Sequence, residues 1–148
     1  MMKNHSYFSL PEYFHLSMWL DRKLHPFLHV TNTELSGYPI DVHLTQRATQ
    51  GLSQLSIPLT VEMQLYFSCV VKKRVLIHSS DTQQTYQPAY ENLYIKFTCV
   101  QADSCSPEEF ASHYPGKKQL TAPANMKMHA RALYIDYKDN EWLAHYDI

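Results

Sequence analysis

The feature that most constrains this fold is the alternation of apolar and polar residues between Leu59 and Ile77. In this run every odd position except Lys73 is apolar, and most even positions are polar. A period of two is typical of a β-strand that buries one face and turns the other toward water. The alternating residues are Val61, Met63, Leu65, Phe67, Cys69 and Val71 on the apolar side and Glu62, Gln64, Tyr66, Ser68 and Lys72 on the other.

A straight strand over this run would be too long for the chain. Residues 59–77, at about 3.3 Å each, would span roughly 60 Å, whereas a globular chain of this length is about 40 Å across. The run must therefore bend, bulge or fold back, and its apolar pattern breaks at Lys72-Lys73-Arg74. Because the odd-position phase resumes at Val75 and Ile77, we expect a strand that bends or protrudes at the basic residues rather than a tight hairpin.

The C-terminal residues form the clearest hairpin pattern in the chain. Two aromatic-rich runs, 130–138 and 141–147, flank Asp139-Asn140, a pair that tolerates the positive φ angles of a type I′ turn. A two-residue loop sets Lys138 opposite Glu141 and continues this register along both strands. It gathers Leu133, Ile135, Tyr137, Trp142, Ala144 and Tyr146 on one face, which we expect to be a core face, and the more polar set Tyr134, Asp136, Leu143 and His145 on the other.

Two segments carry helix start signals. Ser9 and Glu12 have the spacing of a capping box, Pro11 suits a first helical turn, and His25-Pro26 ends the helix because proline disfavours the α conformation in the residue before it. Ser106-Pro107-Glu108-Glu109 predicts a second, short helix that runs to about His113.

The segment from Thr31 to Ser56 has a weaker pattern. Gly37-Tyr38-Pro39 indicates a turn, and apolar residues alternate at Ile40, Val42 and Leu44. This alternation favours a strand, although a helix that runs toward residue 55 is the alternative.

These patterns predict a single α+β domain over residues 1–148. We expect an aromatic-rich, antiparallel sheet of four or five strands, with the N-terminal helix packed on one face and the hairpin at the C-terminus. Exposed strand edges and aromatic rings would be covered by a second copy in a homodimer. The expected strands are 59–77, 93–100, 130–138 and 141–147. In the strand over 93–100, Leu93, Ile95, Phe97 and Cys99 alternate with polar residues.

Composition and charge narrow the function classes. The 13 basic residues nearly cancel the 14 acidic ones, so the net charge of −1 gives no general attraction to nucleic acid or anionic lipid. No apolar run reaches the roughly 18 residues of a membrane span, and the N-terminal residues lack the features of a secretory signal. An odd number of cysteines, 3, fits a reducing compartment. We therefore expect a cytoplasmic protein without membrane or nucleic-acid partners.

The residues that usually carry chemistry form no recognisable catalytic or metal-binding motif. His25 and His29 have a helical spacing but Pro26 lies between them, and Cys99 and Cys105 are too far apart for a common zinc motif. We therefore expect no metal and no cofactor, and the catalytic residues, if any, are unknown. Cys69 and Cys99 lie on the apolar phase of their strands and are predicted to be buried, inert thiols, whereas Cys105 beside a helix start is the more reactive candidate.

The densest basic cluster is the candidate partner-binding site. Lys72, Lys73 and Arg74 at the bend of a long strand could contact an acidic partner, or they could be solvated residues that protect a sheet edge from pairing. Since catalytic motifs are absent, we expect a protein-binding or adaptor domain without catalytic activity of its own. The alternative is a small-molecule-binding or enzymatic domain with a cavity between the helix and the sheet, lined by histidines such as His78, His129 or His145.

Overall fold

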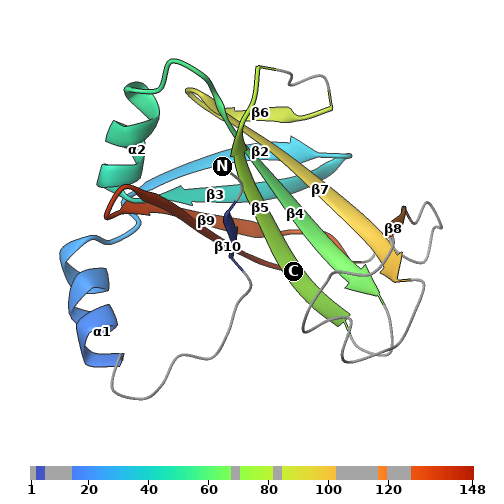
Figure 1. The fold of residues 1–148 in the computed structure, drawn as a ribbon, viewed down its shortest axis with the longest axis horizontal. Helices are drawn as coiled ribbons and strands as arrows, with labels where there is room; N and C mark the ends of the chain where they lie inside the picture. Colours follow the sequence, from blue (N-terminus) through green and yellow to red (C-terminus); the bar gives the residue numbers. More distant parts are fainter. Residues whose placement is uncertain (1–2, 6–14, 68–70, 82–84, 103–116, 120–127) are drawn as a thin grey trace.

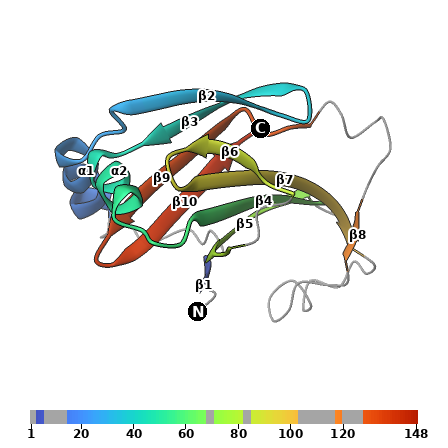
Figure 2. The same cartoon turned by 90° about the horizontal axis from the view of Figure 1, so that it is seen from above.

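The described residues of the chain form two mixed β-sheets that pack face to face, with two short helices at one end (Figure 1). The structure, a computed structural model, describes residues 3–5, 15–67, 71–81, 85–102, 117–119 and 128–148. Figure 2 shows the two sheets edge-on as separate layers. The α+β class is as expected, but the strands form two sheets rather than one, and both sheets contain a parallel pair.

The larger sheet has six strands, in the order β1-β5-β4-β7-β6, with β8 also paired to β7. Strand β4 is antiparallel to β5 and parallel to β7. The strands are β1 (Lys3–His5), β4 (Leu59–Phe67), β5 (Val71–Ser79), β6 (Gln87–Tyr90), β7 (Leu93–Ala102) and β8 (Lys117–Gln119).

The smaller sheet has four strands, in the order β10-β9-β3-β2. Strands β2 and β3 form one antiparallel hairpin, β9 and β10 form another, and the parallel pair of β3 and β9 joins the two. The strands are β2 (His29–Leu35), β3 (Tyr38–Leu44), β9 (Ala132–Lys138) and β10 (Glu141–Asp147).

The expected bent strand over 59–77 is wrong. The run forms two antiparallel strands, β4 and β5, in which Phe67 pairs with Val71 and Leu65 with Lys73. Paired positions in this register are both odd or both even, so the odd residues stay on one face through the reversal, and an unbroken phase does not distinguish a bend from a hairpin. The basic cluster lies inside β5 rather than at a bend.

The even-numbered face of β4 is also less exposed than the alternation predicts. Thr60, Gln64 and Tyr66 are all buried. Polar contacts connect this face to the neighbouring strands. The Thr98 hydroxyl donates to Glu62 Oε1 at 3.3 Å, and the Arg74 guanidinium lies 3.5 Å from the Tyr66 hydroxyl. This face of the larger sheet is therefore a polar, hydrogen-bonded surface rather than a fully solvated one.

The hydrophobic core fills the space between the sheets. The odd-numbered residues of β4 and β7 meet the inner residues of β3, β9 and β10 there. The phenol of Tyr146 reaches across and donates a hydrogen bond to the backbone oxygen of Gln64. The fully buried side chains at the centre include Ile40, Val42, Leu44, Val61, Met63, Leu93, Ile95, Leu133 and Ile135.

The segment from Thr31 to Ser56 contains both of the elements that the sequence left open. The alternating residues form β3 as preferred, and a helix, α2 (Gln46–Ser53), follows at once. Thr45 begins the helix, because its hydroxyl accepts a hydrogen bond from the backbone N–H of Ala48 at 3.2 Å. Ser36 and Gly37, both at positive φ, make the turn between β2 and β3.

The predicted C-terminal hairpin is confirmed in its register. Lys138 pairs with Glu141, and the pairing continues to Ala132 and Asp147. Asp139 and Asn140 have φ angles of 52° and 62°, as a type I′ turn requires. On the predicted core face Leu133, Ile135 and Tyr146 are buried, and Tyr137, Trp142 and Ala144 pack against the core from its border.

The N-terminal helix ends where the sequence predicts but packs differently. Helix α1 (His15–Leu24) stops just before His25-Pro26, while its expected start at Ser9 lies outside the described residues. We expected its apolar residues to cover a sheet face, but its large apolar residues are exposed. The expected helix at 106–113 and the cysteines Cys69 and Cys105 also lie outside the described residues.

Candidate functional site

Helix α1 exposes a surface of large apolar side chains. Leu16, Leu20 and Leu24 follow each other at intervals of four residues, so they form one stripe along the helix. The side chains of Leu16 and Leu24 are 69% and 75% exposed, and that of Trp19 is 52% exposed. We call this set the α1 surface; it consists of Leu16, Trp19, Leu20 and Leu24.

The opposite side of α1 is polar and faces the body of the protein. Asp21 accepts hydrogen bonds from both terminal nitrogens of Arg47, at 3.3 and 2.9 Å, and lies 3.6 Å from the Lys138 ammonium. The Arg22 guanidinium lies 3.6 Å from Asp136. At about 100° per residue, Asp21 and Arg22 project well away from the leucine stripe. The helix is therefore attached to the sheets through charged groups.

Arg47 joins three elements at this attachment. Its Nε and one terminal nitrogen donate to Asp136 of β9 at 2.7 and 2.6 Å, while the guanidinium also holds Asp21 of α1. Arg47 itself belongs to α2. Flanking carboxylates hold the pKa of Arg47 above its ordinary value despite partial burial. One guanidinium thus fixes α1, α2 and β9 relative to each other.

Asp136 is the buried centre of this cluster. The residue is 3% exposed, and its Oδ1 also accepts from the Thr45 hydroxyl at 2.7 Å and from the Tyr137 backbone N–H at 2.8 Å. Burial alone would raise its pKa, but the hydrogen bonds from Arg47, Thr45 and Tyr137 outweigh that effect and lower the pKa to about 2. We predicted Asp136 to lie on the more polar face of the hairpin; it does, but ion pairing has removed it from solvent.

A row of stacked rings lies beside this cluster on the outer face of the smaller sheet. Tyr134 stacks between His43 and His145, with centroid distances of 4.6 and 4.7 Å. Phe27 contacts the row edge-on, 5.3 Å from the Tyr134 centroid, and the Arg22 guanidinium lies 4.2 Å from the centroid of Phe27. Burial lowers the pKa of His145. These contacts continue the attachment of α1 from the charged cluster onto the sheet.

The predicted basic site does not form one cluster of free cations. Lys72 and Arg74 share the outer face of β5, while Lys73 projects from the other face, where its ammonium donates to the backbone oxygen of Tyr146 at 2.9 Å. Lys73 also lies 3.8 Å from Asp147. Lys73 therefore links β5 to the end of β10, and the partner-binding role of Lys72, Lys73 and Arg74 stays a prediction.

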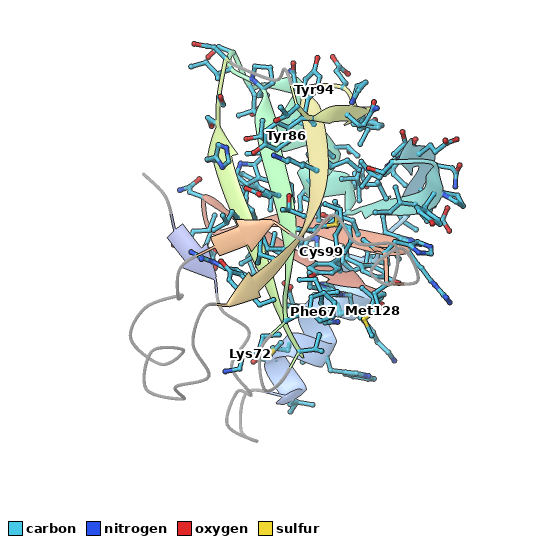
Figure 3. The ribbon with its side chains drawn as sticks, turned by 90° about the vertical axis from the view of Figure 1, so that its right-hand side faces the viewer. Phe67, Lys72, Tyr86, Tyr94, Cys99 and Met128 are labelled. Atoms are coloured by element: carbon cyan, nitrogen blue, oxygen red, sulfur yellow. The ribbon has the colours of Figure 1, made fainter. Side chains whose placement is uncertain are left out.

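The three histidines proposed for a cavity are not brought together. His78 lies 3.4 Å from the hydroxyl of Tyr86 on the larger sheet, His129 stacks on Tyr38 at 4.2 Å, and His145 belongs to the ring row on the smaller sheet. Figure 3 shows Tyr86 and Tyr94 together at one end of the larger sheet, with Phe67 and Lys72 toward the other end. Within the part of the chain that the structure describes, no group of three or more histidine, cysteine or acidic side chains is arranged to hold a metal ion.

Cys99 is half-buried rather than fully buried. Its sulfur lies 4.0 Å from the backbone oxygen of Met128, and the two residues are adjacent in Figure 3. Burial raises the pKa of the Cys99 thiol, so the thiol form is favoured at neutral pH. The predicted full burial of Cys99 is therefore wrong, and its inertness stays a prediction.

Sequence reasoning missed the α1 surface because an apolar stripe on a helix normally faces a core. The sequence does place Asp21 and Arg22 on the other side of the helix from the stripe, but this pattern does not show which of the two sides contacts the sheets.

No family model matches this chain, and neither does any curated protein or solved structure. Among the described residues no helix is long and apolar enough to cross a membrane.

Proposed function

We propose that this chain is a protein-binding domain that recognises its partner through the α1 surface. The observation that carries this proposal is the orientation of α1, whose charged side is ion-paired to the domain and whose apolar side faces water. Exposed leucine and tryptophan side chains on a fixed helix are an unfavourable state in water. Each would gain about 1.5–3 kcal/mol on full burial, and a partner supplies that burial.

The spacing of the exposed residues favours insertion of the helix into a groove. Leu16, Trp19, Leu20 and Leu24 follow the i, i+3, i+4, i+8 spacing by which helices present anchors to a partner. The last turn of α1 is basic, and the Lys23 ammonium lies 3.9 Å from the centroid of the Trp19 ring. The complementary partner is therefore a protein with an apolar groove and acidic residues along its rim.

The proposal is tested by placing a photo-crosslinking amino acid at position 19 and exposing cells that make the protein to light. We expect a defined covalent adduct with one partner protein. The adduct should disappear in the triple variant Leu16→Ser, Leu20→Ser and Leu24→Ser, which removes the stripe but keeps Asp21. The same photo-crosslinker at Leu28, an exposed apolar residue outside α1, is the matched control and should not form that adduct.

Two outcomes would contradict the proposal. One is crosslinking that is equally efficient from positions 19 and 28, because that would indicate random collisions. The other is binding of the purified parent, and not of the triple variant, to vesicles of anionic lipid, which would show that α1 lies on membranes instead of entering a protein groove.

A further inference from the structure

We propose that Arg47 and Lys138 form an anion-binding site that Asp21 of α1 occupies from within the same chain, and that a phosphate group can take the place of Asp21 and loosen α1. The residues involved contact the charged side of α1, on the other side of the helix from the α1 surface. The inference therefore does not rest on the proposed function.

Arg47 presents two edges of its guanidinium to two different carboxylates. Its Nε and Nη2 donate to Asp136 at 2.7 and 2.6 Å, while its two terminal nitrogens, Nη1 and Nη2, donate to the two oxygens of Asp21 at 3.3 and 2.9 Å. The second arrangement is the end-on, bidentate geometry by which arginine binds both carboxylate and phosphate groups. The Asp21 carboxylate thus occupies the position of an anionic ligand.

The cations of this site are held by residues that do not belong to α1. Asp136 binds Arg47 from the side, and the Thr45 hydroxyl donates to the same carboxylate at 2.7 Å. Lys138, whose ammonium lies 3.6 Å from Asp21 Oδ2, is the last residue of β9. If Asp21 leaves, Arg47 and Lys138 stay in place, so the site is pre-organised for another anion.

Asp21 is the member of the cluster that can leave. It belongs to α1, which has ten residues, and a helix of this length is marginal in water without tertiary contacts. The side chains of Arg47 and Asp21 are 19% and 22% exposed, so solvent reaches their ion pair. A dissolved anion can therefore compete with Asp21 for the guanidinium.

The charges of the cluster favour a phosphate group over a second carboxylate. Among the described groups, three cations lie within 3.6 Å of two carboxylates. The hydrogen bonds from Arg47 hold the pKa of Asp21 below its ordinary value despite burial, so Asp21 supplies one full negative charge at neutral pH. A phosphate ester carries close to two charges there, and in place of Asp21 it would balance the third cation. The cations are Arg22, Arg47 and Lys138, and the carboxylates are Asp21 and Asp136.

The first test is a titration with inorganic phosphate at about pH 7.5 and constant ionic strength, followed by the NMR signal of the Arg47 Nε–H group. Asp21→Ala removes the internal competitor and should bind phosphate at least about tenfold more tightly than the parent. The matched control is Asp41→Ala, which removes the same charge from an exposed position of β3. This control should bind phosphate as the parent does.

Further titrations of the Asp21→Ala protein identify the site and the ligand. Adding Lys138→Ala should weaken phosphate binding at least about fivefold, because one charge-assisted contact is lost. Acetate should bind more weakly than phosphate, since it carries a single charge. Tighter binding of N-acetylphosphoserine amide than of inorganic phosphate would identify a phosphorylated side chain as the source of the group, and the reverse order would identify the free ion.

The second test is hydrogen exchange of the parent protein. If phosphate and Asp21 compete, bound phosphate must weaken the attachment of α1 by the same factor by which Asp21 weakens phosphate binding. We expect saturating phosphate to speed the exchange of residues 15–24 at least about tenfold, relative to chloride at the same ionic strength. The exchange of β9 and β10 should not change.

Three results would overturn the proposal. They are equal phosphate affinity of the parent and Asp21→Ala, equal affinity with and without Lys138→Ala, and unchanged exchange of α1 in saturating phosphate. If a variant does not fold, the exchange experiment on the parent still decides. None of these measurements uses the photo-crosslinker on the α1 surface, so a failure of the proposed function would leave them valid.

Discussion

The ion pair of Arg47 and Asp136 holds several elements of the fold together. The guanidinium holds carboxylates from two different elements, and the buried carboxylate also accepts from the residue that caps α2. A buried carboxylate is stable only while these donors surround it. The cluster therefore stabilises the fold by joining these elements. We expect the free energy of unfolding to depend on pH because of this contribution.

Asp136→Asn should lower the free energy of unfolding at pH 7 by roughly 3 kcal/mol, the lower end of the range for breaking a buried pair, since Arg47 keeps Asp21. The pKa of Asp136 is about 2 in the folded protein and about 3.9 in an unfolded chain. Its contribution is therefore complete above about pH 5 and is lost as the pH falls through about 4 to 2. Urea unfolding between pH 2 and 7 should show a flatter acid limb for the variant.

The control for this prediction is Asp41→Asn, an exposed carboxylate that accepts from Asn32 at 2.7 Å. It should change the unfolding free energy by less than about 0.5 kcal/mol. An equal loss in both variants would show that Asp136 has no special role.

At the scale of elements, α1 is the helix whose position depends on few contacts. Among the described contacts, the ion pairs of Asp21 and Arg22 attach it, while its large apolar residues are exposed. An element held this way should open independently of the core. Its local stability and the stability of the sandwich are therefore separable quantities.

Asp21→Ala should release α1 without unfolding the sheets. We expect the amides of residues 15–24 to lose protection in hydrogen exchange, while the unfolding free energy falls by no more than about 1 kcal/mol, as for a partly exposed ion pair. Lys23→Ala, on the same helix but outside the attachment, should leave the exchange of α1 nearly unchanged. Loss of protection in β9 or β10 along with α1 would contradict a locally attached helix.

At the scale of the whole molecule, Trp142 closes the end of the sandwich between β10 and α2. Its ring lies 4.5 Å from that of Tyr137, and it approaches Gly51 of α2 so closely that an added Cβ would lie 3.0 Å from Trp142 Cη2. Glycine inside a helix costs about 1 kcal/mol relative to alanine. The close approach of the tryptophan explains why glycine occupies this position.

A double-mutant cycle tests this contact. Trp142→Ala should lower the unfolding free energy by about 3 kcal/mol, because a large side chain packed against the core is lost. Gly51→Ala should destabilise the parent, where the tryptophan must shift, but should stabilise the Trp142→Ala protein by about 1 kcal/mol through helix propensity. The same sign of effect in both backgrounds would show that the two residues do not limit each other.

The sequence by itself determined the features that depend on neighbouring residues. The register of the hairpin of β9 and β10 was predicted to the residue because its turn pair and its alternation lie within a few positions of each other. The end of α1 before His25-Pro26 and the strand over 93–100 follow from equally local rules. The sequence identified the basic cluster as a candidate site, but it did not show that Lys72 and Arg74 lie on one face of β5 and Lys73 on the other.

Only the tertiary structure decided which strands are neighbours and which side of α1 docks. The parallel pairs β3–β9 and β4–β7 join segments far apart in the chain, and a period of two is the same in either sheet. In the pair of β4 and β5, odd positions lie opposite odd positions, so the apolar residues stay at odd positions after the reversal. The sequence pattern therefore does not reveal the reversal. The orientation of α1 depends on Arg47 and Asp136, which are residues outside the helix. An apolar stripe in the sequence shows which residues share a helix face, but it does not show what that face contacts.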